Sequence, residues 1–389
     1  MRASSTDSAP GVGVYLHVPF CARACPYCDF DFEVVRRPDD SGYVSALARE
    51  FEERAEPLGR VRVDTIYVGG GTPSTLRGAT FSKMFAELRA RAGAYEPREV
   101  TVEANPEHVT REWLLALRAA GATRVSLGVQ SLSRQGLVTL GRAHHATKAR
   151  EAMETIHALG LDASVDLIVG WPGQTPAALA EDIEIIRDAG VAHVSVYALT
   201  VEPGTPWEGL VARGARAPVD EDAQADLLER CERSLESAGF RHYEIASYAK
   251  PAKQAQHNRK YWRWHDFLGF GPSAASAVAT QGGGLERRVN ARGFAEWARS
   301  NGDERAILDR LDPETAGREG LWLGLRLLEP LDTSELEARF ERPSGWARRR
   351  LARQIELGNV LSPSAERVVV APGRWLWHDV IAHDVLKAT

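Results

Sequence analysis

Short apolar runs alternate with amphipathic stretches along most of the chain, and this alternation predicts parallel strands joined by crossover helices. Runs rich in Val, Ile and Tyr are expected as strands at residues 12–18, 63–70, 99–104, 124–130, 162–170, 193–200 and 242–247. Segments such as 43–55, 111–121 and 146–160 place apolar residues at helical spacing between them. Alternation of this kind is typical of a β/α barrel, complete or partial, with its reactive face at the carboxyl ends of the strands.

The pattern changes toward the end of the chain. Residues 311–340 and 344–361 are expected as helices, and 367–386 as a short hairpin followed by a final helix. We therefore expect a small helical, winged-helix-like domain after the barrel. The predicted domains are a disordered lead-in at 1–11, the barrel at 12–250, a connecting segment at 251–300 and the C-terminal domain at 301–389.

Three cysteines lie within eight residues directly after the first expected strand. Cys21, Cys25 and Cys28 have the spacing Cys-x3-Cys-x2-Cys, and the chain contains four cysteines in all. Three thiolates can hold three irons of a four-iron cluster and leave the fourth iron open to a small molecule. A zinc site would need a further ligand such as Cys231 or His17, and three crowded cysteines give no sensible disulfide framework. Three buried thiols without a metal stay open as an alternative.

The residues around the triplet, YLHVPFCARACPYCDF, resemble the radical S-adenosylmethionine (SAM) superfamily. Within it, HVPFC and CPYCDF resemble the family of oxygen-independent coproporphyrinogen III oxidases and its heme-chaperone branch, HemW. The resemblance implies a partial TIM-type barrel with a 4Fe-4S cluster on Cys21, Cys25 and Cys28. It also implies that SAM binds the open iron and that an electron from the reduced cluster cleaves the sulfonium.

The second expected strand ends in the glycine-rich segment GGGTP, residues 69–73. A turn without side chains lets a ligand approach the backbone amides closely, although many such turns only reverse the chain. The resemblance implies that Gly70, Gly71 and Thr72 contact SAM.

Polar residues end or follow the later apolar runs. Glu103, Gln130, Arg142 and Asp166 are the examples, and a buried polar group there needs a partner, which capping or loop bonding could supply. The resemblance implies that these residues surround the carboxylate and the ribose hydroxyls of SAM, with Arg142 suited to the carboxylate. Tyr15, on the first strand, matches a tyrosine of the family's cofactor site, and core packing is its alternative role.

A second group of candidate residues lies near position 260. His257, Tyr261 and Trp262 stand among basic residues, and an imidazole can ligate heme iron while flat aromatics stack on a macrocycle. An aromatic cluster is more often part of a core. The sequence His257-Asn258-x-x-Tyr261-Trp262 resembles the HNxxYW motif of the chaperone branch, which implies His257 as a heme ligand.

Two departures separate this chain from its relatives. Phe30, two residues after Cys28, replaces a further cysteine of the oxidase branch, and this argues against decarboxylation of a porphyrinogen. The segment GFGPSAAS has Ser273 and Ala275 where relatives usually have glycine and histidine.

Composition favours a protein of the reducing cytoplasm. The formal net charge is -5, so no overall positive field attracts nucleic acid. The arginines at 348–350 and 353 are expected on a solvated or ion-paired helix face. No apolar run approaches the roughly 18 residues that cross a bilayer, whereas peripheral contact with a membrane stays open.

We therefore expect a heme chaperone that binds a 4Fe-4S cluster, SAM and heme and passes heme to apo-hemoproteins. It would need an electron donor for the cluster. The alternative is an oxygen-independent coproporphyrinogen III oxidase. Whether the chain is an enzyme, and whether it is a monomer or a dimer, stays open.

Overall fold

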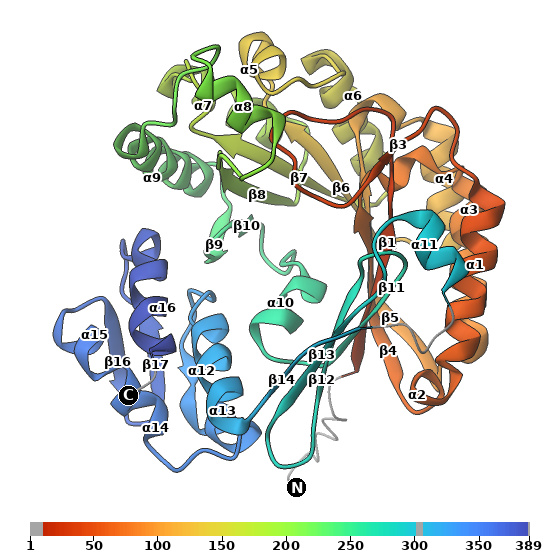
Figure 1. Ribbon diagram of the computed structural model, residues 1–389. Helices are drawn as coiled ribbons and strands as arrows, with labels where there is room; N and C mark the ends of the chain where they lie inside the picture. The colour runs from red at the N-terminus through yellow and green to blue at the C-terminus, as the bar shows by residue number, and fades with distance from the viewer. Residues whose placement is uncertain (1–10, 301–305, 388–389) are drawn as a thin grey trace, which may run out of the picture.

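A large, curved sheet forms the centre of the computed structural model, which describes residues 11–300 and 306–387 (Figure 1). Its strand order is β14-β13-β12-β11-β1-β4-β5-β6-β7-β8-β10-β9. Neighbouring strands from β11 to β8 are parallel, and the pairs at both ends are antiparallel. The order runs from β14 to β9 without closing, so the sheet forms a partial barrel. This confirms the predicted fold class; the expected lead-in lies outside the described residues except for Gly11.

The predicted parallel strands are present, with one exception. They are β1 (Val12–Val18), β4 (Arg62–Gly70), β5 (Ala94–Ala104), β6 (Arg124–Gln130), β7 (Asp162–Val169) and β8 (His193–Ala198). The run at 242–247 was expected as one more parallel strand, and this was wrong. It is split between the antiparallel strands β9 (Arg241–Glu244) and β10 (Ser247–Ala249), because two residues separate them and a parallel pair needs a long crossover.

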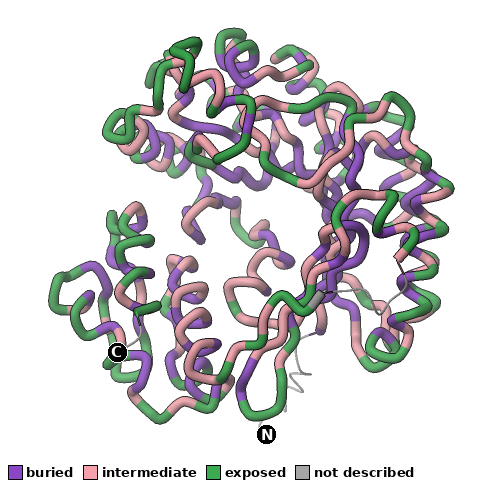
Figure 2. Tube along the Cα trace, viewed as in Figure 1, coloured by how far each residue is buried: buried purple, intermediate pink, exposed green. Residues whose placement is uncertain are grey.

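Helices cover the outer face of the sheet, where Figure 2 shows mostly buried residues beneath them. The longer ones are α1 (Asp40–Glu53), α3 (Gly78–Arg91), α4 (Arg111–Ala120), α6 (Ala146–Ala158), α7 (Pro176–Asp188) and α9 (Glu221–Ser237). Shorter ones are α2 (Ala55–Gly59), α5 (Arg134–Thr139) and α8 (Pro206–Ala212). Several begin at a capping side chain: Thr110 and Thr175, for example, accept a hydrogen bond from the backbone N–H three residues later.

The alternation of side chains along each parallel strand separates the core from the barrel interior. On β1, Val14 and Leu16 are fully buried and pack in the main core with residues of the covering helices. Tyr15 and His17 point to the opposite face. Asp166 takes the same inward position on β7, between buried apolar neighbours. The period of two thus gathers polar and aromatic side chains inside the barrel.

The segment expected as a connection contributes further strands to the sheet. It forms α10 (Gln256–Trp262), β11 (Phe267–Phe270), β12 (Ala275–Ala279), β13 (Leu285–Val289) and α11 (Phe294–Arg299), and β14 (Ala306–Leu311) follows. Because β11 pairs with β1, this part of the chain lies against the start of the barrel. The division of the chain at 250 and 300 stays a prediction.

The C-terminal part has a core of its own and is mainly helical, as predicted. Its elements are α12 (Pro313–Gly324), β15 (Leu331–Asp332), α13 (Thr333–Arg339), α14 (Trp346–Arg350), α15 (Ala352–Glu356), β16 (Val360–Ser364), β17 (Arg367–Val370) and α16 (His378–Leu386). The hairpin begins earlier than expected, because Gly358 leaves the helix with a φ of 71° and residues 360–364 pair with β17. Among the described residues, no helix combines the length and the apolar character that a membrane crossing requires.

Candidate cofactor pocket

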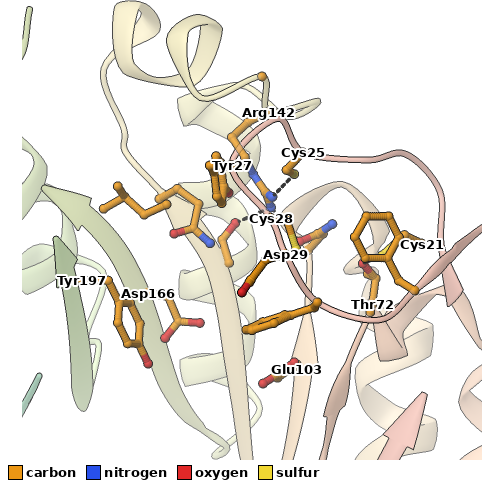
Figure 3. A pocket seen from close by; sticks show the side chains of 18 of the residues that line it. Cys21, Cys25, Tyr27, Cys28, Asp29, Thr72, Glu103, Arg142, Asp166 and Tyr197 are labelled. Carbon is orange, nitrogen blue, oxygen red and sulfur yellow. Dashed lines mark hydrogen bonds between the residues drawn. The ribbon is translucent and has the colours of Figure 1, made fainter. Parts of the chain in front are cut away.

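The three cysteines lie around one pocket at the carboxyl ends of the parallel strands (Figure 3). The pocket has a volume of about 410 Å³, which is in the range of sites for small molecules and cofactors. Cys21 ends the short strand β2 (Phe20–Cys21), and the loop that follows carries Cys25 and Cys28 before β3 (Glu33–Val34). Cys21 is buried, and the other two are partly exposed to the pocket.

The glycine-rich turn packs directly against the strand that carries Cys21. The amides of Gly71 and Thr72 donate to the carbonyl oxygens of Val18 (2.8 Å) and Phe20 (2.7 Å). A Cβ on Gly71 would stand 2.8 Å from the carbonyl oxygen of Phe20 and 3.1 Å from the sulfur of Cys21. These amides therefore fasten the turn to the cysteine strand, and glycine is needed because the two segments approach so closely.

Gly70 and Thr72 contribute in different ways. Gly70 has a φ of 110°, which favours glycine, and its amide bonds to Glu103. The Thr72 hydroxyl lies 3.3 Å from the sulfur of Cys21. All three predicted residues of the turn line the pocket, and their contact with SAM stays a prediction.

Two acids face the pocket from β5 and β7. Burial raises the pKa of Glu103 to about 7, although a hydrogen bond from the Tyr67 hydroxyl (2.7 Å) opposes this. Burial also raises the pKa of Asp166 to about 6, against hydrogen bonds from Ser195 and Ser126. Both carboxylates can accept hydrogen bonds from hydroxyl groups of a ligand, and such bonds would favour the ionised forms of the two acids.

Arg142 places a positive charge beside the cysteine loop. Its Nη1 lies 3.1 Å from the sulfur of Cys25, and its Nη2 donates to Asn105 (2.6 Å) and to the carbonyl of Gly128 (2.7 Å). Its buried Nε has no hydrogen-bond partner among the described residues. The guanidinium thus lies against the sulfur of Cys25, and one of its N–H donors is left without a described partner at the pocket.

The last two residues predicted to contact SAM, Gln130 and Tyr15, differ in whether they reach the pocket. Gln130 lines the pocket at the end of β6, where its φ of 66° is uncommon for a residue other than glycine. Tyr15 does not line the pocket. It stacks on Tyr67, with ring centroids 6.2 Å apart, and its hydroxyl bonds to His17 (3.1 Å).

His257 lies apart from the pocket in the closed interior of the barrel. It is fully buried, with Nδ1 3.0 Å from the Thr65 hydroxyl and Nε2 2.8 Å from the Tyr261 hydroxyl. Its backbone N–H donates to Glu99 (2.9 Å), and burial lowers the pKa of the imidazole to about 3. The structure therefore does not bring His257 together with the cysteines, and both ring nitrogens have partners.

Several lining residues were not predicted. Tyr67 lines the pocket from β4. Tyr197 lines it from β8, and Tyr27 lines it from the loop between Cys25 and Cys28 (Figure 3). Their positions in the sequence were the available signal. Tyr67 and Tyr197 lie near the carboxyl ends of predicted strands, and Tyr27 lies between two cysteines, so these positions indicate the reactive face of the barrel for all three.

The cysteine set fits a cluster better than a single ion. No group of three or more His, Cys, Asp or Glu side chains in the described part of the chain could hold one metal ion. In a cluster each thiolate binds a different iron, so the sulfurs need not converge on one point. Burial raises the pKa of Cys21 to about 11 and that of Cys28 as well, so metal binding must displace protons from these thiols. His17 and Cys231, considered for zinc, do not line the pocket.

Comparison with known proteins agrees with this chemistry. The model of the radical SAM superfamily matches residues 15–186. The heme chaperone HemW of Mycobacterium tuberculosis (strain CDC 1551 / Oshkosh) is 34% identical over 384 residues, covering 96% of this chain and 94% of the relative. HemW of Escherichia coli (strain K12) is 36% identical over 288 residues, covering 73% of this chain and 74% of the relative.

A solved structure supports the same architecture. Coproporphyrinogen III oxidase (HemN) from Escherichia coli, described as a radical SAM enzyme, superposes with a TM-score of 0.81. It shares 22% sequence identity, and the match covers 96% of this chain and 90% of that chain. At this identity the likeness concerns the fold alone.

The partial barrel, the cysteine triplet and the pocket define a radical SAM protein, a class that implies a 4Fe-4S cluster and SAM. Within that class, the similarity to HemW of Mycobacterium tuberculosis extends over nearly the whole chain. The chain belongs to the HemW family of radical SAM proteins.

Proposed function

We propose that this protein is a heme chaperone that binds a 4Fe-4S cluster, SAM and heme and delivers heme to apo-hemoproteins. The observation that carries the proposal is the similarity to proteins named heme chaperone HemW, which extends over 96% of the chain in one of them. Its cofactor pocket combines cysteine, glycine and acidic residues of the kind that this class requires.

Cys21, Cys25 and Cys28 would hold the cluster, with the Arg142 guanidinium beside the sulfur of Cys25. When bound, cluster and SAM supply an electron and a 5'-deoxyadenosyl radical. The protein's own contribution is to hold the thiolates at the end of the barrel and to offer Glu103 and Asp166 as acceptors. Gly70, Gly71, Thr72 and Gln130 complete the proposed set at the pocket, and Tyr15, which does not line it, would contribute only through its stacking on Tyr67.

The proposed iron ligand for heme is His257, and its surroundings set a condition on binding. Its Nε2 must exchange the Tyr261 hydroxyl for iron, and α10, which carries both residues, must move to admit a macrocycle. Heme ligation at this position therefore requires a rearrangement, since a fully buried side chain offers no open approach.

Phe30 separates the chaperone from the oxidase proposal. It stands where the oxidase branch has a further cysteine, and it lies at the pocket with 66% of its surface exposed. An electron donor for the cluster and a reducing compartment such as the cytoplasm belong to the same proposal.

One experiment tests the function. The cluster is reconstituted anaerobically, and heme and coproporphyrinogen III are presented in turn while heme absorbance and release of carbon dioxide are followed. A chaperone binds heme without releasing carbon dioxide, and sustained decarboxylation would show an oxidase instead.

The ligand assignment is tested on the same samples with His257→Ala. His383→Ala, which removes an exposed histidine on α16, serves as the matched control. We expect loss of the heme spectrum in the first variant and retention in the second. Because His257 is buried, circular dichroism and cluster absorbance are recorded in parallel to separate lost ligation from lost folding.

A further inference from the structure

The loop that carries the cysteines is fastened at its far end by a polar contact with a distant segment. Asp31, three residues after Cys28, accepts hydrogen bonds from the Ser273 hydroxyl and from the amide of Gly293 (3.1 Å). Arg292 lies 3.7 Å from the same carboxylate. These bonds and the charge of Arg292 lower the pKa of Asp31, although burial opposes them, so the acceptor is the ionised form.

The backbone of Asp31 is tied to the barrel as well. Its carbonyl oxygen lies 3.0 Å from Nε2 of His17, and Nδ1 of His17 lies 3.1 Å from the Tyr15 hydroxyl. A carbonyl can only accept, so Nε2 carries the proton and Nδ1 accepts from Tyr15. Burial lowers the pKa of His17, which agrees with this neutral form. A continuous chain of bonds thus joins Ser273, Asp31, His17 and Tyr15.

Ser273 is held in a conformation that its backbone does not favour. Its φ is 56°, in the left-handed region where a side chain other than glycine is disfavoured. Glycine would adopt this turn freely. The bond from the serine hydroxyl to an ionised carboxylate is of the stronger, charge-assisted type and offsets the backbone cost.

The contact matters because the loop has little regular structure of its own. Residues 22–32 lie outside any helix or strand, and Cys25 and Cys28 are only partly buried. The middle of the loop is held by the bond from the amide of Trp207 to the carbonyl of Pro26 (2.8 Å). Asp31 is the first anchor after Cys28, and Glu33 follows it, since its amide donates to the carbonyl of Pro19 (2.6 Å) and its carboxylate accepts from the amide of Phe294 (2.8 Å).

We propose that Ser273 is a positioning residue for the cluster: its bond to Asp31 fixes the end of the cysteine loop and slows loss of iron from Cys21, Cys25 and Cys28. The inference rests on the proposed cluster binding and adds a determinant that lies outside the cysteine motif. Ser273 bonds Asp31 and no cysteine, so its effect on the cluster is transmitted through the end of the loop, and one hydrogen bond to a charged group corresponds to a change of about tenfold.

The test compares three variants. Ser273→Ala removes the hydroxyl and keeps the backbone strain, whereas Ser273→Gly removes both. Ala252→Gly is the matched control, because Ala252 also has a positive φ (61°) and is exposed in a turn, and the change relieves strain without removing a polar contact.

Cluster absorbance is followed anaerobically in the presence of an iron chelator, and thermal unfolding is measured on the apoprotein. We expect both Ser273 variants to lose the cluster faster than the wild type, by up to about tenfold for one lost hydrogen bond to a charged group, and Ala252→Gly to match the wild type. Apo Ser273→Gly should melt no lower than the wild type, since strain relief compensates for the lost bond. Cluster loss at the wild-type rate in both Ser273 variants would overturn the proposal.

Hydrogen exchange of peptides from residues 22–35 in the apoprotein gives a reading that does not need a cluster. Faster exchange of this loop in Ser273→Gly, with wild-type exchange elsewhere, supports the positioning role, and unchanged exchange contradicts it. A wild-type protein that takes up no cluster would refute the proposed function, and this result is distinguishable from unchanged exchange.

Discussion

The cofactor pocket and the surroundings of His257 lie in the same barrel but differ in how far their polar groups are already satisfied. In the pocket, Arg142 has a buried donor without a partner among the described residues, and Glu103 and Asp166 have raised pKa values. Around His257, both ring nitrogens and the backbone amide are bonded. The pocket is therefore prepared for a ligand, whereas the histidine must first give up a bond.

The largest expected effect concerns the cysteines. Cys25→Ser removes one of three proposed iron ligands, and we expect complete loss of the brown cluster absorbance after anaerobic reconstitution. Cys231→Ser is the matched control, because Cys231 is buried on α9 and does not line the pocket. Retention of the cluster in Cys25→Ser, or its loss in the folded control, would contradict the proposed ligand set.

Arg142 sharpens the contrast from the pocket side. Arg142→Lys keeps the charge but loses the guanidinium fork, which bonds Cys25, Asn105 and Gly128 and is proposed to bind the carboxylate of SAM. We expect SAM affinity to fall by about 2 kcal/mol, roughly thirtyfold, because a hydrogen bond to a charged group is lost. The measurement is equilibrium binding of SAM to protein with an oxidised cluster. Arg150→Lys, on the exposed face of α6, should bind SAM as the wild type does. Equal affinity in both variants would remove Arg142 from the site.

Glu103 should make SAM binding depend on pH. Its pKa of about 7 is that of the free pocket, and a ligand hydroxyl that donates to the carboxylate lowers it. Binding then releases a proton, so affinity rises with pH and levels off above about 7. We expect Glu103 to supply a gain of about tenfold between roughly pH 6 and pH 8, and Glu103→Gln to keep only a rise of about twofold, which comes from Asp166 with its pKa of about 6. The same slope in that variant would assign the titration to another group.

The smallest expected effect concerns the buried surroundings of His257. Tyr261→Phe keeps the ring and removes the hydroxyl that occupies Nε2 of His257. If heme iron takes this nitrogen, one competing hydrogen bond of about 1 kcal/mol disappears and heme should bind roughly fivefold tighter. Absorbance titration measures the affinity, and addition of His257→Ala to the same variant should abolish the gain. Weaker heme binding in Tyr261→Phe would show that the hydroxyl supports the heme site instead.

Local patterns were enough to predict most of the barrel. The period of two in the apolar runs and the helical spacing between them identified β1 and β4 to β8, because strands buried on one face show their pattern directly in the sequence. The same reasoning misjudged residues 242–247, where a turn of two residues makes the neighbouring strands antiparallel. It also missed that β11 joins the sheet beside β1, since pairing between residues about 250 positions apart leaves no local signal.

The candidate site divides in the same way. Spacing identified the cysteines and the glycine-rich turn, and the structure places all of them around one pocket. Spacing could not indicate that the amides of the glycine-rich turn bond to the strand that carries Cys21, or that the Tyr67 hydroxyl donates to Glu103. Nor could it indicate that the Tyr261 hydroxyl is hydrogen-bonded to Nε2 of His257. Such contacts join strands and helices whose relative positions are set only by packing.

By itself, the sequence determined the chemistry available to this protein: three thiols at a spacing suited to a cluster and a glycine-rich turn after the second expected strand. The tertiary structure decided which polar groups are buried with hydrogen-bond partners and which keep an unpaired donor or acceptor. Near the cysteines it left the Nε of Arg142 without a partner within the described part of the chain, it buried His257, and it linked Ser273 to Asp31 across 242 positions. The physical reason is that burial and hydrogen bonding depend on neighbours in space, which residue order alone does not specify.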